Sequence, residues 1–391
     1  MQAETSADHS TGQINMERHE LAQHLAETFA PTLVIYPEDR AKRPYDERRI
    51  LEVEEMGDYQ PCPVDLALDN FRLYRQGLVF RAIGEKFQGR PARFSTELQW
   101  LQDMILNETD LDDSEINLTG VEHDRPSTAW DQYFFLTPDR EGGMARLPEP
   151  HPVVVYARVI SAQDVQPPAA SLADGTYTPE DVAIQYWSFY YYNHFWNLHE
   201  IDWELVTVIV RPDGQGNWQP IRTGYSAHVS GTRREWQDVL TNPDNPNSPL
   251  VFVSAGSHAQ YFDHDEKGYA IVAREIRRFA WLRRFLAWIV RINISDMLSR
   301  RMVDVVPPNE KRFHLRPKVV LMPKSAPVDD PQWWWMNYKG RWGAKPRRMI
   351  DLGNPDRTLL TEGPRGPWLQ GNRWSDPFAW VQGLHVDDPT H

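Results

Sequence analysis

Short runs of β-branched and aromatic residues recur along the chain and predict β-strands. The clearest run covers residues 202–210, which no Gly or Pro interrupts. An aromatic run over residues 182–196 carries rings on both of its predicted faces, as expected for a central strand that is covered on two sides. Further strands are predicted over residues 32–36, 78–83, 132–136, 152–160 and 250–254. This pattern indicates a β-rich fold.

Two segments show helical periodicity instead. Leu21, Leu25 and Phe29 recur at four-residue spacing, which predicts a short amphipathic helix over residues 16–29 that Pro31 ends. Over residues 271–303, apolar residues fall at three- and four-residue steps and predict one long helix or two shorter ones. The apolar face of this segment consists of Ile276, Phe279, Leu282, Leu286 and Val290.

The remaining segments suggest how the chain is organised. Residues 1–15 are polar and without periodicity, so we expect a flexible tail. Residues 333–343 and 363–368 are dense in Trp, Gly and Pro, and we expect ordered irregular structure there because disordered segments are poor in aromatic residues. We therefore predict an α+β, β-rich fold with a β-sandwich-like core, peripheral helices and a long Trp/Gly/Pro-rich C-terminal wrap. It would form a single large domain over residues 16–391, with a helical insertion at 271–303.

Composition narrows the class of protein. The 391 residues carry a net charge of −13, which argues against general nucleic-acid binding because neutralising phosphates requires a basic surface. The single cysteine, Cys62, can form no intrachain disulfide. There is no apolar run of membrane-spanning length and no basic N-terminal region followed by an apolar core. We therefore expect a cytoplasmic protein without a membrane span and without a nucleic-acid partner.

Potential functional side chains are concentrated around residues 199–204. Side chains two apart on a strand share a face, so Asp202 and Glu204 should project together while Trp203 points the other way. Trp203 should then be buried beneath the carboxylates and shield one side of them from water. His199 precedes them in what we expect to be a loop that turns back towards the same point.

Two further histidines, His228 and His258, follow at the ends of predicted strands and have small neighbours. Together with Asp202 and Glu204 they form a candidate catalytic set, because paired carboxylates and imidazoles can separate into a general acid and a general base. The same carboxylates can instead bind a divalent cation, and oxygen ligands favour Ca or Mg over Zn. Paired carboxylates also occur on ordinary solvated strands, so the pattern leaves these alternatives open.

A strongly basic segment stands out in this acidic chain. Between Arg274 and Arg301 there are eight arginines against two acidic residues. The face opposite the apolar one carries Arg274, Arg277, Trp281, Arg284 and Trp288. These arginines could pair with the acidic remainder of the protein, lie on an anionic membrane surface, or fit the groove of a partner protein.

The sequence resembles the vacuolar protein sorting-associated protein 62 family, whose members carry a His-x-x-Asp-Trp-Glu core followed by Ser-x-His and Gly-Ser-His-Ala elements. Here these elements are residues 199–204, 226–228 and 256–259. Residues 29–38, 338–343 and 363–367 also resemble that family, so the similarity spans most of the chain. Its members share a name derived from trafficking and no agreed biochemical activity.

A more distant similarity is to the necrosis- and ethylene-inducing toxin-like proteins. Their His-Asp-Trp-Glu motif lies on a β-sandwich and binds a divalent cation at a surface that acts on membranes. The resemblance implies that His199, Asp202 and Glu204 are cation ligands. This chain departs from the toxins because Glu200 and Ile201 separate the histidine from Asp-Trp-Glu, and because it lacks a secretion signal and a disulfide pair. Both departures argue against direct lysis outside the cell.

Three functional hypotheses follow. The first is a divalent-metal-binding β-sandwich protein that acts at an anionic membrane surface, as a peripheral membrane protein, or on a hydrophobic small molecule. The second is an enzyme, metal-dependent or acid–base, which would be a hydrolase or a cyclase or lyase for an apolar substrate. The third is a structural trafficking or interaction module.

Overall fold

The computed structural model describes residues 18–35, 60–65, 71–75, 90–91, 134–138, 151–165, 175–193, 199–227, 230–263, 306, 312–325, 327, 330, 332–337, 341–342 and 364–387. The predicted strand at 78–83, the predicted helices at 271–303 and His228 lie outside these residues. The role expected for Arg274, Arg277, Trp281, Arg284 and Trp288 therefore stays a prediction.

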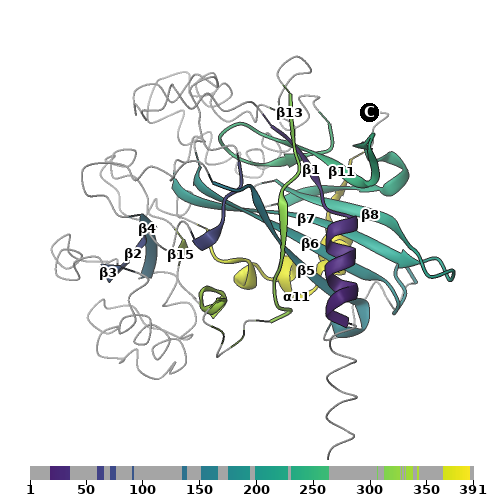
Figure 1. The fold of residues 1–391 in the computed structure, drawn as a ribbon, viewed down its shortest axis with the longest axis horizontal. Helices are drawn as coiled ribbons and strands as arrows, with labels where there is room; N and C mark the ends of the chain where they lie inside the picture. The colour runs from purple at the N-terminus through teal and green to yellow at the C-terminus, as the bar shows by residue number, and fades with distance from the viewer. Residues whose placement is uncertain are drawn as a thin grey trace, which may run out of the picture.

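A seven-stranded sheet, here called the large sheet, forms the centre of the molecule (Figure 1). Its order is β14 (Lys318–Leu321), β5 (Val154–Ser161), β6 (Val182–Asn193), β7 (His199–Pro212), β8 (Trp218–Ala227), β9 (Ser230–Glu235) and β16 (His385–Val386). The strands β5 to β9 pair antiparallel in sequence order. The edge strands β14 and β16 come from much later in the chain and pair parallel. The sheet is therefore a meander whose two edges are covered from the C-terminal part.

A second mixed sheet, the small sheet, lies against one face of the large sheet. It contains β10 (Thr241–Asn242), β11 (Asn245–Val253), β1 (Thr32–Ile35) and β13 (Phe313–Leu315), with β12 (Gln260–Tyr261) also paired to β11. A further sheet has the order β15 (Arg341–Trp342), β4 (Phe134–Pro138), β2 (Phe71–Arg75) and β3 (Arg90–Pro91). The predicted β-rich, sandwich-like fold is confirmed.

The helical elements are short and peripheral. Residues 18–28 form the N-terminal helix, in agreement with the predicted helix. The C-terminal part contains α11 (Asn372–Ser375) and α12 (Pro377–Gly383). Single 3₁₀ turns are η3 (Ala162–Asp164), η4 (Trp236–Asp238), η6 (Trp334–Asn337) and η9 (Pro367–Leu369). None of the described helices is long and apolar enough to cross a membrane.

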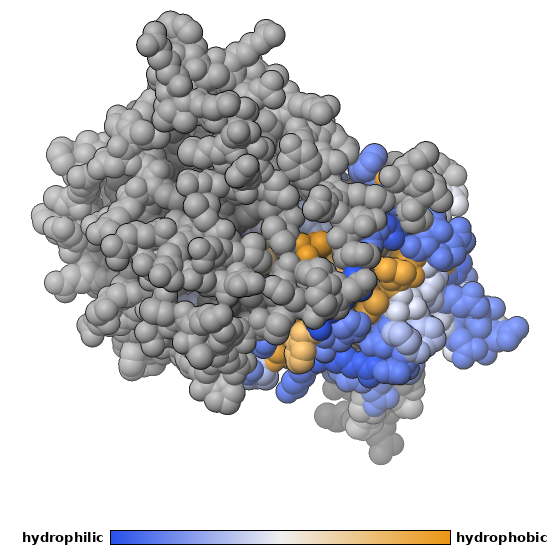
Figure 2. Space-filling model, turned by 90° about the horizontal axis from the view of Figure 1, so that it is seen from above, coloured by the Kyte–Doolittle hydropathy of each residue, from blue (hydrophilic) through white to orange (hydrophobic). Residues whose placement is uncertain are grey.

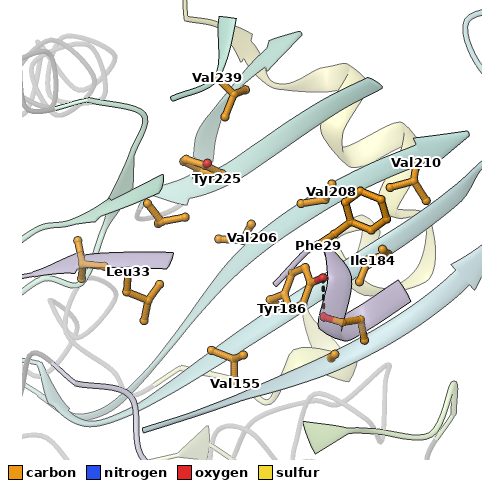
Figure 3. Close-up of a cluster of buried hydrophobic side chains, with 14 of the residues drawn as sticks. Phe29, Leu33, Val155, Ile184, Tyr186, Val206, Val208, Val210, Tyr225 and Val239 are labelled. Atoms are coloured by element: carbon orange, nitrogen blue, oxygen red, sulfur yellow. Dashed lines mark hydrogen bonds between the residues drawn. The ribbon is translucent and has the colours of Figure 1, made fainter. Parts of the chain in front are cut away.

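One face of the large sheet packs against the N-terminal helix and the small sheet (Figure 3). Val206, Val208 and Val210 alternate along β7 on this face and are buried with Phe29 and Leu33. Each such apolar side chain contributes about 1.5–3 kcal/mol on full burial. Tyr186 donates its hydroxyl proton to the carbonyl of Ala26 at 3.0 Å, which satisfies a carbonyl near the end of the N-terminal helix.

The opposite face of the large sheet packs against the C-terminal part of the chain. Ile209 and Ala183 contact Phe378 and Val381 of α12. Nearby, rings from β5, β6, β7 and the Trp-rich segment form an aromatic cluster that consists of Tyr156, Phe189, Trp203, Trp333, Trp335, Trp342 and Trp368. The predicted C-terminal wrap is thus present in the described residues, and its aromatic rings pack against Phe189 and Trp203 of the large sheet.

A buried arginine, Arg158, connects the C-terminal part of the chain to the large sheet. Arg158 of β5 donates hydrogen bonds to the Trp374 carbonyl at 2.6 Å and to the Gln185 side chain at 2.9 Å. Its guanidinium also lies 3.8 Å from the centre of the Trp374 ring. Burial lowers the pKa of Arg158 to about 9. Through these hydrogen bonds the guanidinium acts as a fixed array of donors at this interface.

One local prediction needs correction. His199 lies within β7, paired with Asn193, and not in a loop before the strand, because β6 and β7 continue their ladder to the end of the hairpin. The Asn- and Pro-rich stretch 242–249 contains the start of β11, which begins at Asn245. It forms a tight connection between β10 and β11, in which the Asn242 side chain accepts a hydrogen bond from the Asp244 amide at 2.9 Å.

The surface of the described part is mainly hydrophilic in the view of Figure 2, with small hydrophobic patches. Among the described residues, four large apolar side chains are exposed: Leu21, Leu240, Phe313 and Val386. They come from different elements, and scattered apolar side chains of this kind are normal on a folded protein.

Replacing Trp203 by alanine should destabilise the protein by about 3–5 kcal/mol, because a large ring would be lost from a packed interior. Trp203 is only 2% exposed, and its ring centre lies 4.8 Å from that of Phe189 and 5.8 Å from that of Trp342. Urea unfolding measures the change. Phe313→Ala is the control, because Phe313 is 49% exposed and should lose little. A similar small loss in both variants would contradict the assigned role of Trp203.

Candidate functional site

The centre of the candidate site is a contact between Asp202 of β7 and His258, which lies in the turn between β11 and β12. The Nδ1 atom of His258 is 3.2 Å from the Oδ2 atom of Asp202. The His258 side chain is fully buried, and that of Asp202 is 11% exposed. Asp202 also accepts hydrogen bonds from the Asn193 side chain and from the Trp203 amide, each at 3.0 Å. These contacts fix the position of a carboxylate that would otherwise be costly to bury.

Unusual backbone conformations flank this contact on both sides. Among the described residues, Ile201 and His258 are the two non-glycine residues with positive φ, at 62° and 57°. A positive φ at a β-branched residue such as Ile201 is an outlier, and each such residue costs about 1–3 kcal/mol. Ile201 immediately precedes Asp202, where the ladder between β6 and β7 shows no pairing for one step. The chain thus holds His258 itself, and the residue that immediately precedes Asp202, in strained conformations.

Tyr190 of β6 completes one side of the centre. Its ring stacks on that of His258, with ring centres 3.9 Å apart and an interplanar angle of 6°. Tyr190 pairs with Asp202 in the ladder, so the two side chains share a face of the large sheet. Burial raises the pKa of Tyr190, and the nearby carboxylates of Glu204 and Asp202 raise it further. The phenol therefore stays protonated and can act as a hydrogen-bond donor.

Glu204 lies on the same face as Asp202, as the register of β6 against β7 requires. Ser226, near the end of β8, donates a hydrogen bond to the Glu204 carboxylate. The same serine oxygen accepts the Leu205 amide proton at 2.7 Å, where β7 and β8 begin to separate. One hydroxyl therefore positions the second carboxylate and also satisfies a backbone amide.

A buried arginine from the C-terminal part supplies positive charge near these carboxylates. Arg373 of α11 donates to the Ser230 carbonyl at 2.9 Å, at the start of β9. Burial lowers the pKa of Arg373, while Glu204 and Asp202 act in the opposite direction. The site therefore combines two buried carboxylates, a histidine, a tyrosine and a counter-charge.

The structure brings together Asp202 and His258 from the sequence-predicted set and places Glu204 beside them. His199 begins β7, but its side chain is outside the described residues, as is all of His228. Within the described part, no three His, Cys, Asp or Glu side chains are grouped so as to hold a metal ion. The described side chains alone therefore do not fit a divalent cation, and the cation ligands stay a prediction.

Sequence analysis did not find the partners of the carboxylates. Asn193 and Ser226 reach Asp202 and Glu204 across the neighbouring strands, which only the register reveals. Arg373 lies 169 positions after Glu204, and no local motif marks it. Tyr190 belongs to the aromatic run that predicted a central strand, but its stacking on His258 depends on the β11–β12 turn.

No protein-family model and no curated protein matches the chain. Two solved structures are similar to part of it. The non-toxic HaNLP3 protein shares 15% identity over 29% of this chain and 47% of its own, with a TM-score of 0.21. A mutant of NLPPya shares 18% identity over 28% of this chain and 45% of its own, with a TM-score of 0.20. Part of the chain is thus distantly similar in structure to proteins of this kind, whereas the resemblance to the vacuolar protein sorting-associated protein 62 family rests on the motifs alone.

Replacing Ser226 by alanine should destabilise the protein by about 1–3 kcal/mol, because the Leu205 amide and the Glu204 carboxylate would both lose a buried partner. Denaturant unfolding measures the loss. Ser230→Ala is the matched control, because Ser230 is a partly exposed serine whose contact with Arg373 uses only its carbonyl. If the two variants were equally stable, the bridging role of Ser226 would be wrong.

Proposed function

We propose that the protein is an acid–base enzyme that transfers a proton within an apolar small molecule at the Asp202–His258 centre. The observation that carries this proposal is the strained backbone at Ile201 and His258, on both sides of a buried carboxylate–imidazole contact. Strain of this kind persists only where the surrounding structure enforces it, and it is concentrated at functional sites.

The contact supports a definite assignment of roles. An ionised Asp202 can only accept, so Nδ1 of His258 carries the proton and Nε2 carries the lone pair of a base. His258 would take a proton from one atom of the ligand and return it to another atom of the same ligand. Such an isomerisation, elimination or cyclisation needs no oxidant and no further reactant. Asp202 would stabilise the imidazolium formed between the two steps.

The surroundings favour an apolar ligand. Tyr190 stacks on His258, and the interior that Asp202 faces is otherwise lined by side chains such as Val206, Tyr225 and Phe262. Apolar and aromatic walls with a few convergent polar groups are typical of small-molecule sites. Tyr190, kept protonated by burial, could donate a hydrogen bond to charge that develops on the ligand.

In D₂O, the wild-type protein should convert a component of an organic extract of the cells that naturally contain it, and the product should carry solvent deuterium. Asp202→Asn and His258→Gln should each slow the conversion at least about 100-fold, because general acid–base catalysis typically contributes that much. Mass spectrometry of the extract before and after incubation measures both the change and the label.

The controls for this experiment are Asp238→Asn and His314→Gln, which alter exposed residues of the same types. All four variants should be compared by circular dichroism, so that loss of the fold is not mistaken for loss of chemistry. If the wild-type protein and Asp202→Asn leave identical extracts, the proposed enzyme activity is refuted.

A divalent cation at the start of β7 is a second candidate, favoured by the common face of Asp202 and Glu204 and by the position of His199 at the first residue of the strand. Ca or Mg at 100 times its dissociation constant would then stabilise the protein by about 2.7 kcal/mol. Thermal unfolding should show a higher Tm with the cation, and the rise should vanish in an Asp202→Asn, Glu204→Gln variant but not in Asp238→Asn. An unchanged wild-type Tm would remove this candidate.

A further inference from the structure

A fully buried amide lies two residues beyond His258. Gln260 of β12 is 0% exposed, and neither its side-chain nitrogen nor its side-chain oxygen has a hydrogen-bond partner. The side chain of Tyr190, whose ring stacks on that of His258, is equally buried, and its hydroxyl interacts with the side chain of Ser188. Buried polar groups are satisfied in the great majority of cases, so the unpaired amide of Gln260, two residues from His258, calls for an explanation.

Sheet pairing shows where the Gln260 side chain points. Gln260 pairs with Val253 of β11, and paired residues lie on the same face of a sheet. Val253 belongs to the core between the small and the large sheet, whereas Tyr261, paired with Phe252, packs on the other side. Gln260 therefore projects into the interior that Asp202, Glu204 and Tyr190 face from the large sheet. Its strand lies against β7 and β8.

The chemistry of the unpaired atoms indicates the partner they lack. The amide of Gln260 offers both donors and an acceptor, and the hydroxyl of Tyr190 offers one more donor. A group that both donates and accepts, such as a hydroxyl or a carboxamide, satisfies this set. An anionic group would be costly here, because the carboxylates of Asp202 and Glu204 face the same interior, and Gln260 and Tyr190 offer no charge that could pair with an ionic group.

We propose that Gln260 and Tyr190 form the recognition subsite of the Asp202–His258 centre and bind an uncharged hydroxyl or amide group on an otherwise apolar ligand. The inference deepens the proposed function and rests on it for the identity of the centre, but the recognition step itself requires no turnover. It accounts for a buried amide that the fold leaves without a partner.

The test uses cyclohexanol as the probe and methylcyclohexane as its counterpart without the hydroxyl. Saturation-transfer NMR titration of the intact protein should show that cyclohexanol binds and that methylcyclohexane binds more weakly. Gln260→Leu keeps the shape of the side chain and removes its hydrogen-bonding groups, so cyclohexanol affinity should fall about tenfold. Tyr190→Phe keeps the stacking on His258 and should also weaken binding.

Matched controls separate recognition from folding. Gln219→Leu changes an exposed glutamine of β8 and should leave cyclohexanol binding unchanged. Without the probe, Gln260→Leu should melt at or above the wild-type temperature, because it removes polar atoms that have no partner. Tyr186→Phe should melt lower, because it loses the hydrogen bond to Ala26.

The outcomes also separate this inference from the proposed function. Asp202→Asn should still bind cyclohexanol, so binding with no conversion in D₂O would refute the enzyme and leave the subsite intact. If cyclohexanol failed to bind the wild-type protein, buried water would be the occupant of the polar atoms and the subsite would be refuted. Equal affinity in the wild-type protein and Gln260→Leu would refute it as well.

Discussion

A buried carboxylate must find hydrogen-bond donors within the protein, and the structure around Asp202 follows from this requirement. Among the described residues, its contacts come from Asn193 on β6, the Trp203 amide on β7 itself, and His258 in a turn of the small sheet. The contact with His258 joins the small sheet to the large sheet. It adds to their shared hydrophobic core and to the hydrogen bond from the Tyr225 hydroxyl to the Leu250 carbonyl, and it lies at the end where β7 and β8 begin to separate.

The two faces of the large sheet carry different kinds of side chains at the start of β7. On the face towards the N-terminal helix, β-branched residues alternate along β7 and give way to carboxylates at its start. On the other face, the same strand end is covered by Trp203 and its aromatic neighbours, which exclude water from beneath the carboxylates. Electrostatic interactions of a buried charge are stronger in such dry surroundings than in water. The aromatic cluster and the polar centre are therefore two sides of one arrangement.

Much of the fold could be predicted because its strongest signals are local. The unbroken run 202–210 and the aromatic run from residue 182 both lie in central strands, and the four-residue spacing of Leu21, Leu25 and Phe29 identified a real helix. Local signals also predicted that Trp203 would be buried opposite Asp202. The predicted loop position of His199 was wrong, since the ladder from β6 continues past Asp202 to that residue.

The rest depended on contacts between distant parts of the chain. His258 reaches Asp202 from a turn in which the histidine itself has a positive φ. The residues around it do not predict this conformation. Arg373, Ser226 and Gln260 acquire their positions from sheet register and from the docking of the C-terminal part. No periodicity marks such residues, because each is a single polar position within an otherwise ordinary segment.

The edges of the large sheet have a consequence for synthesis of the chain. The strands β5 to β9 are complete once residue 235 has been made, but β14 and β16, which cover the two edges, begin only at Lys318 and His385. A ribosome adds roughly 5–20 residues per second, so the central meander exists for several seconds with both edges exposed. Unpaired edges of this kind invite pairing with other chains. The pairing of β14 and β16 thus protects the meander from aggregation, and until both strands have been synthesised this protection has to come from elsewhere, for example from chaperones.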